Sequence, residues 1–310
     1  MSRSRGTSRS AGTFPMHENV TPGAGHGSPA SIVLEHVSKT YPTSGGGWTE
    51  AVKDVSLTVR QGEFLSILGP SGCGKSTLLR MIAGLLPVTQ GRILVAGVEV
   101  KRPVTDVGIV FQKPVLLEWR TVLENVLLQP ELRGADTRAF VARARDLLVS
   151  VGLEGFEDSH PRQLSGGMQQ RASIARALVN DPPLLLMDEP LGALDALTRE
   201  QMRVDLEELW LQSSKTVVFI THSIDDAVLL SDRVVIMSPR PGCIDHVIDI
   251  DLPRPRALAG RKHEGFHVAE EAITAIFLER GVLQRSRGLT AAEIARHTES
   301  SPATRRQTVS

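Results

Sequence analysis

The sequence of 310 residues predicts an α/β fold in which buried strands alternate with helices. Three short apolar runs have the length and character of strands buried on both faces of a sheet. They are Phe64–Leu68, Leu184–Met187 and Thr216–Ile220. The first run leads into a glycine-rich loop, and a helical pattern of leucine and isoleucine follows that loop. This strand-loop-helix order sets the core of the fold.

The glycine-rich loop matches the pattern G-x-x-x-x-G-K-[ST] of a phosphate-binding loop. Its glycines let the backbone wrap around a polyphosphate, and its N–H groups and the following helix N-terminus favour an anion. Lysine would reach the β- and γ-phosphates, and serine would supply a hydroxyl to Mg²⁺. An ordinary glycine-rich turn is the weaker alternative. The loop residues are Gly69, Pro70, Ser71, Gly72, Cys73, Gly74, Lys75, Ser76 and Thr77.

Composition limits the class of protein. Hydrophobic residues make up 41% of the chain, enough for a packed core, and 35 basic residues balance 35 acidic ones. The neutral balance gives no overall electrostatic case for nucleic acid. Two cysteines favour a reducing, cytosolic setting, and no apolar run reaches the ~20 residues that span a bilayer. A membrane role would therefore need a membrane-spanning partner.

An antiparallel β section is expected on either side of the phosphate loop. Strands at 32–34 and 55–59 flank a glycine-rich loop at 43–47, and strands at 92–95 and 98–100 follow the loop helix. Tyr41, the single tyrosine, precedes the glycine-rich loop. Spacing alone favours an aromatic residue that closes a strand end over one that stacks on a base.

A helical section is expected at about 113–180. The stretch 113–121 has no regular periodicity and carries apolar groups including Trp119, so it is either a contact surface or a loop packed on the core. An apolar stripe at helical spacing follows between 140 and 151. Ser165 is placed as an N-cap before a second helix, where Gly166 and Gly167 leave backbone N–H groups open to an anion.

Two adjacent carboxylates end the strand at 184–187. Open α/β sheets bind their ligands at this end of their strands. Asp188 is the expected Mg²⁺ partner, and Glu189 would orient or deprotonate water beside the γ-phosphate. His222 ends the next strand at the same edge, where a γ-phosphate contact competes with a structural role.

The ends of the chain differ from its body. Residues 1–30 are rich in Ser, Gly, Arg and Pro and predict a disordered tail. Residues 31–253 form the predicted nucleotide-binding domain. The composition changes after Pro253, so 254–310 is predicted to be an extension, helical at 271–278, with a capping box at 290–293 and a polar end.

Five features in one order resemble the nucleotide-binding subunit of an ABC transporter over about residues 32–252. They are the phosphate loop, Gln112, the stretch Leu164–Gln170, the strand ending in Asp188 and Glu189, and His222. The resemblance implies a P-loop NTPase core with an antiparallel β subdomain and an α-helical subdomain. It also implies two copies that face head to tail, with two ATP molecules between them.

The resemblance also implies a role for each site residue. Tyr41 would stack on adenine, which reverses the preference from spacing. Lys75 would bind the phosphates, Glu189 would be the catalytic base and His222 the switch histidine. Ser76, Gln112 and Asp188 would hold Mg²⁺, with Thr77 beside them on the phosphates. Ser165, Gly166, Gly167 and Gln170 would bind the ATP held by the partner, and Gly192–Asp195 would cross the dimer interface.

A narrower resemblance concerns the importer ATPases of the nitrate, sulfonate and taurine group. It rests on 116–126, 191–199 and the Ser-Pro-Arg-Pro-Gly stretch at 238–242. It implies that the loop around Trp119 receives membrane-spanning permease subunits at the cytoplasmic face of the membrane, with a solute-binding protein acting indirectly. The group usually has Pro at position 118 and often Phe at 191, where this chain has Glu118 and Leu191.

Two alternatives compete with the importer subunit. A soluble ATPase of the same superfamily would act on nucleic acid or ribosomes. The interval from Thr77 to Leu164 is too short for the coiled coil of repair-type members, and the single cassette is unlike translation-type members. A nucleotide-binding module without hydrolysis is the other alternative, and the presence of Glu189 and His222 argues against it. The sequence leaves the solute open.

Overall fold

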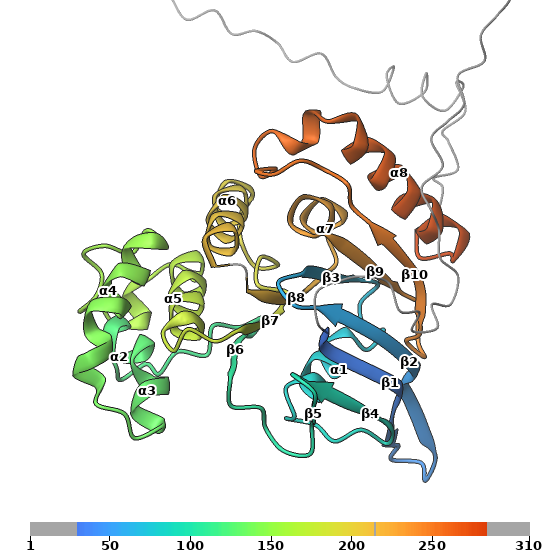
Figure 1. The fold of residues 1–310 in the computed structure, drawn as a ribbon, viewed down its shortest axis with the longest axis horizontal. Helices are drawn as coiled ribbons and strands as arrows, with labels where there is room; N and C mark the ends of the chain where they lie inside the picture. Colours follow the sequence, from blue (N-terminus) through green and yellow to red (C-terminus); the bar gives the residue numbers. More distant parts are fainter. Residues whose placement is uncertain (1–29, 214, 284–310) are drawn as a thin grey trace, which may run out of the picture.

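The computed structural model describes residues 30–213 and 215–283. The predicted N-terminal tail, apart from Ala30, and the predicted capping box at 290–293 lie outside the described residues. The described residues form two β-sheets and three groups of helices (Figure 1). None of the described helices has the length and apolar character needed to cross a bilayer.

The larger sheet has six strands in the order β10-β9-β3-β8-β7-β6. All neighbours pair in parallel except β10, which is antiparallel to β9. The carboxyl ends of five strands therefore meet at one edge of the sheet. The strands are β3 (Phe64–Leu68), β6 (Val107–Val110), β7 (Leu184–Asp188), β8 (Thr216–Thr221), β9 (Arg233–Met237) and β10 (Ile244–Asp249).

The smaller sheet has four antiparallel strands in the order β2-β1-β4-β5. The predicted loop at 43–47 joins its two long strands, in which Pro42 pairs with Trp48. The antiparallel β section expected from the sequence is therefore present. The strands are β1 (Ala30–Pro42), β2 (Trp48–Arg60), β4 (Gln90–Val95) and β5 (Val98–Glu99).

Alternate residues of the buried strands feed two hydrophobic clusters on opposite faces of the large sheet. On β7, Leu185 and Met187 pack with the helical section, whereas Leu184 and Leu186 pack with α1 and the small sheet. Because both faces are covered, both sets of side chains are apolar, and the strand reads as an unbroken apolar run. This packing explains why the sequence pattern marked these strands so clearly.

The helices form three groups (Figure 1). α1 lies between the two sheets, α2 to α5 gather beside β6 and β7, and α6 and α7 cover the opposite face, with α8 packed over α7. Their bounds are α1 (Lys75–Ile82), α2 (Val122–Val126), α3 (Leu128–Leu132), α4 (Val141–Ser150), α5 (Gly166–Leu178), α6 (Ala196–Ser213), α7 (Ile224–Leu230) and α8 (Glu264–Glu279). Short 3₁₀ turns lie at Thr137–Phe140, Pro161–Gln163 and Gly260–Lys262.

The C-terminal helix is longer than the sequence pattern predicted. It begins at Glu264 rather than at 271, and His263 caps it by accepting the N–H of Gly265 through Nδ1 at 3.1 Å. A histidine cap lacks the usual Ser, Thr, Asp or Asn signal. Phe266, Ile273 and Phe277 pack in one cluster with β9, so residues on both sides of position 253 share a core.

Candidate functional site

The phosphate loop joins β3 to α1, as the sequence motif requires. Gly72 and Gly74 have φ angles of 78° and 103°, a left-handed region that strains side-chain-bearing residues. A Cβ at Gly74 would also lie 2.6 Å from the carbonyl oxygen of Ala51 on β2. The loop therefore needs glycine at both places, once for conformation alone and once for a close backbone approach.

Lys75 is 4% exposed, and its ammonium group points back into the loop. Nζ donates hydrogen bonds to the carbonyl oxygens of Gly69 at 2.8 Å and Pro70 at 3.0 Å. Cys73 is also buried, and this burial raises the pKa of its thiol. The raised pKa keeps the Cys73 thiol neutral, so the positive charge within the loop is the Lys75 ammonium group.

Glu189 lies at the meeting point of three strand ends. It follows β7 with a left-handed φ of 46°, which costs a residue with a Cβ about 1–2 kcal/mol. Its Oε2 accepts from Gln112 Nε2 at 3.2 Å and lies 3.3 Å from His222 Nδ1, and its Oε1 lies 3.9 Å from Lys75 Nζ. The fold thus brings together residues that lie more than a hundred positions apart.

Asp188 and Ser76 form a second contact beneath this group. Ser76 Oγ donates to Asp188 Oδ1 at 2.8 Å. Burial is the largest influence on Asp188 and raises the pKa of its carboxyl, while the Ser76 hydrogen bond opposes that shift. A buried carboxylate beside a hydroxyl is a set of hard oxygen donors, which suits Mg²⁺.

A cavity of about 570 Å³ is lined by Lys75, Ser76, Gln112 and Glu189 and by Tyr41, which is 37% exposed. Asp188 and His222 do not line it and reach it through their contacts with Ser76 and Glu189. Tyr41 ends β1 on the small sheet, and the phosphate loop and Glu189 line the same cavity. The sequence assigned no site role to Thr43, Thr49, Ala51 and Arg240, which line it as well. The strand-end rule could have found Arg240, because it follows β9 at the same sheet edge.

The helix N-terminus at Ser165 lies outside the cavity that contains Lys75 and Glu189. Ser165 caps α5, its Oγ accepting the N–H of Met168 at 3.3 Å, and Gly166 has open space around it. Neither Ser165 nor the two glycines line the cavity of their own chain. Gln170 is 3% exposed, and its amide donates to the carbonyl oxygen of Phe111 at 3.2 Å. It therefore contacts the backbone next to Gln112 rather than an open surface.

The loop at 113–121 combines both interpretations left open by the sequence. Leu116 packs against the core, whereas Trp119 is 74% exposed. The buried Asn125 bonds to the backbone of Leu117 through both ends of its amide, at 2.7 and 3.1 Å. Arg176 donates to the carbonyl oxygens of Pro114 and Val115 at 2.6 and 2.7 Å. The loop is held on two sides and presents its tryptophan outward.

Comparisons with known proteins agree with this geometry. Residues 52–192 match the ABC transporter family model. An uncharacterised ABC transporter ATP-binding protein of Methanocaldococcus jannaschii is 51% identical over 225 residues, which are 73% of this chain and 84% of the relative. The taurine import ATP-binding protein TauB of Ruegeria pomeroyi is 40% identical over 268 residues, 83% of this chain and 98% of the relative.

Solved structures give the same result. The dimeric structure of a bacterial ABC transporter cassette aligns with a TM-score of 0.64 at 36% identity, covering 71% of this chain and 98% of that one. A dimeric post-hydrolysis cassette bound to ADP and Pi aligns with a TM-score of 0.63. The chain belongs to the ABC transporter family. It is an ATP-binding and ATP-hydrolysing subunit of that family, so the predicted family, fold class and ATPase activity are confirmed.

Proposed function

We propose that this subunit powers the uptake of a small anionic solute, with taurine, another sulfonate or nitrate as the class to test first. The observation that carries the proposal is the combination of the Glu189 cluster with the outward-facing Trp119 loop. Relatives named as taurine import proteins support the direction of transport and the solute class. A soluble ATPase acting on nucleic acid or ribosomes stays the alternative from another class.

In this proposal the cavity binds ATP. Tyr41 stacks on the adenine, and the backbone N–H groups of the loop Gly69–Gly74 (all but Pro70, which has none), with Lys75 and Thr77, bind the phosphates. Glu189 accepts a proton from the attacking water, and His222 Nδ1 lies 3.3 Å from Oε2 of that carboxylate. The contacts of 3.2–3.9 Å around Glu189 orient its carboxylate oxygens and are long enough to leave them able to accept a proton from water.

Mg²⁺ would be held by Ser76, Asp188 and Gln112, because the oxygen atoms of the first two already lie together, with Ser76 Oγ donating to Asp188 Oδ1 at 2.8 Å. When bound, the ion neutralises phosphate charge as bonds to the γ-phosphate break. Within the chain, Ser76 and Asp188 fix each other's orientation, and Gln112 links the ligand set to Glu189 through its amide.

The second half of the site would come from another copy. Ser165 and Gly166 are exposed and Gly167 is half-buried at a helix N-terminus, and none of them lines the cavity of its own chain, so this helix end would bind the ATP of a partner. Gln170 would hold the backbone at Phe111 in this scheme. ATP between two surfaces favours closure of the head-to-tail dimer, and hydrolysis reopens it.

The Trp119 loop would dock the permease at the cytoplasmic face of the membrane, with the solute-binding protein acting from the other side. Trp119→Ala should keep basal ATP turnover and lower co-purification with the membrane subunit several-fold, because an exposed aromatic anchor is lost. Trp48→Ala is the matched control, since Trp48 is 72% exposed on the small sheet. An intact complex with Trp119→Ala would contradict docking at this loop.

Uptake assays test the function itself. Cells that lack the gene should lose uptake of one member of the anionic solute class, and the wild-type gene should restore it. Co-purification with a polytopic membrane protein, rather than with nucleic acid, separates the importer from the soluble ATPase. Recovery of nucleic acid without a membrane partner would favour the alternative.

A further inference from the structure

The turn Ser238–Cys243 follows β9 and places Arg240 at the cavity, but no chemical role has been assigned to it so far. β9 pairs in parallel with β3, whose carboxyl end carries the phosphate loop. Among the other parallel strands, β7 ends at Asp188, and Gln112 and His222 follow the ends of β6 and β8. Every other parallel strand of the sheet thus delivers a functional group to this sheet edge, which makes the end of β9 a place to search for one more.

The turn closes on itself through Ser238. Its N–H donates to the carbonyl oxygen of Cys243 at 3.0 Å, and its Oγ accepts the N–H of Cys243 at 3.0 Å. The same hydroxyl donates to the carbonyl oxygen of Pro241 at 3.1 Å. Three hydrogen bonds to one residue fix the conformation of the turn.

Gly242 seats the turn on the nucleotide-binding elements. Its N–H donates to the carbonyl oxygen of Ala51 at 3.1 Å, and its carbonyl oxygen accepts the N–H of Lys53 at 3.0 Å. A Cβ at position 242 would overlap the carbonyl oxygen of Cys73 in the phosphate loop. The close approach therefore requires glycine, and it places the turn directly against the phosphate loop.

Arg240 stands between two cavities. It lines the cavity that contains Lys75 and Tyr41, and it lines a second cavity of about 530 Å³. The second cavity also involves Ser71 and Gly72 of the phosphate loop, and Gly281 and Val282 after α8. The residue is exposed, so its side chain is accessible to solvent beside both cavities.

We propose that Arg240 binds the polyphosphate of the bound nucleotide, as a second cation beside Lys75. A guanidinium group offers a planar set of donors that matches phosphate oxygens, and such charge-assisted bonds are about twice as strong as neutral ones. The turn holds the backbone of Arg240 in place, so only its side chain must order on binding. This inference rests on the proposed assignment of the cavity to ATP.

Titration calorimetry of the full chain with ATP and Mg²⁺ tests the inference. Arg240→Ala should raise the Kd for ATP by about tenfold, as expected for loss of a hydrogen bond to a charged group. Arg240→Lys should give an intermediate Kd, and the effect on AMP binding should be smaller than on ATP binding. Arg102→Ala, at another exposed arginine outside the cavity, should leave the Kd unchanged.

Lys75→Ala, measured in parallel, separates two kinds of failure. Normal ATP affinity in Lys75→Ala would contradict the assignment of the cavity itself. Weak binding in Lys75→Ala with an unchanged Kd in a folded Arg240→Ala would overturn only the role of Arg240. An unchanged Kd together with weaker ATP-induced dimerisation would also overturn it, and would place Arg240 at the subunit interface instead.

Discussion

Glu189 and Glu207 are both mostly buried carboxylates, yet the chain holds them in opposite ways. Glu189 follows a strand in a left-handed conformation, and its partners are side chains at 3.2–3.9 Å. Glu207 lies within α6, is 2% exposed and accepts the backbone N–H groups of Arg256 and Ala257 at 2.7–2.8 Å. One carboxylate remains available for chemistry, and the other is committed to structure.

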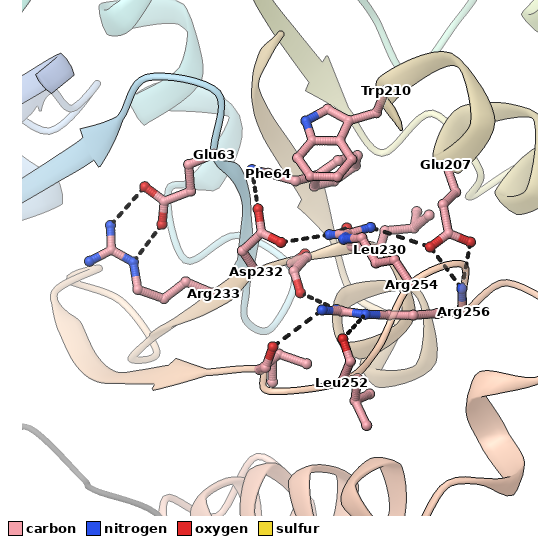
Figure 2. Close-up of polar contacts among 12 residues, drawn as sticks. Glu63, Phe64, Glu207, Trp210, Leu230, Asp232, Arg233, Leu252, Arg254 and Arg256 are labelled. Carbon is pink, nitrogen blue, oxygen red and sulfur yellow. Dashed lines mark hydrogen bonds and ion pairs between the residues drawn. The ribbon is translucent and has the colours of Figure 1, made fainter. Parts of the chain in front are cut away.

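The residues around Glu207 show how a structural carboxylate is held in place (Figure 2). Arg254 stacks on Trp210 at 4.1 Å and bonds to Asp232 at 2.8 Å. Arg256 donates to the backbone carbonyl oxygens of Ser231 at 2.6 Å and Leu252 at 3.0 Å, and burial is the main cause that lowers its pKa to about 10. These arginines tie the segment after β10 to α6 and α7, with their donors largely occupied.

The same substitution at both glutamates gives the largest predicted contrast. Glu189→Gln should lower ATP turnover by about a thousandfold, because the amide cannot take a proton from water. It should keep ATP binding and trap the dimer, since the γ-phosphate contacts persist. Steady-state phosphate release and size-exclusion chromatography with ATP measure the two effects.

Unchanged turnover in Glu189→Gln would remove Glu189 as the base. Its thermal midpoint without nucleotide should stay within a few degrees of the wild type, because Lys75 keeps its hydrogen bonds to the loop carbonyl oxygens and His222 is half exposed. A large fall in the midpoint would break the contrast with Glu207 by showing that Glu189 is structural as well.

Glu207→Gln should instead lower stability by about 2–3 kcal/mol. The amide nitrogen would face a backbone N–H donor, which leaves buried groups without acceptors. For a chain of this size that corresponds to a fall in the thermal midpoint of roughly 4–12 °C. Turnover per folded molecule should be retained at low temperature.

Glu208→Gln is the matched control, since Glu208 is the next residue on α6 and is exposed. It should move the midpoint by less than about 2 °C. Equal midpoints for Glu207→Gln and Glu208→Gln would contradict the structural role of Glu207. A loss of turnover at full stability would place Glu207 within the catalytic coupling instead.

The sequence reveals the first glutamate and not the second for a physical reason. Glu189 ends an apolar strand in a protein with a phosphate loop, so its position and its chemistry are both visible in the pattern. Glu207 appears as one charge on a helix, because its shortest contacts come from the backbone N–H groups of Arg256 and Ala257 some fifty residues away, with Arg254 Nη1 farther off at 3.4 Å. Backbone donors carry no residue identity, and no local pattern marks them.

The same distinction, between local sequence patterns and contacts to distant backbone atoms, separates the predictable features of the rest of the molecule from the others. Strands, the phosphate loop and the cap at Ser165 follow from local rules and could be predicted. The supports of the Trp119 loop could not, because Asn125 and Arg176 act on backbone atoms. The burial of Gln170 was also missed, since its place in a motif suggested a ligand contact. The strand-end rule points to Arg240 at the end of β9, but its place beside the phosphate loop depends on the pairing of β9 with β3.

Asp181 gives the smallest predicted effect in this comparison, as an exposed carboxylate held by two cationic side chains. Its Oδ1 accepts from Lys215 at 2.6 Å and Arg143 at 2.8 Å, and the Lys215 hydrogen bond is the main cause that lowers the pKa of Asp181 below 3.8. Asp181→Asn should cost about 0.2–1 kcal/mol in urea unfolding at pH 7, because exposed pairs are screened. Asn also accepts the left-handed φ of 51° at this position.

The pH dependence follows from the direction of that shift. A folded-state pKa below the unfolded value means that ionised Asp181 stabilises the fold above pH 3.8, and that this contribution is lost as pH falls through the folded-state pKa. The difference between wild type and Asp181→Asn should therefore be full at pH 7, shrink below pH 3.8 and weaken in 1 M salt. Asp158→Asn, at an exposed aspartate, should show no such convergence. A pH-independent difference at Asp181 would assign its effect to hydrogen bonding rather than to charge.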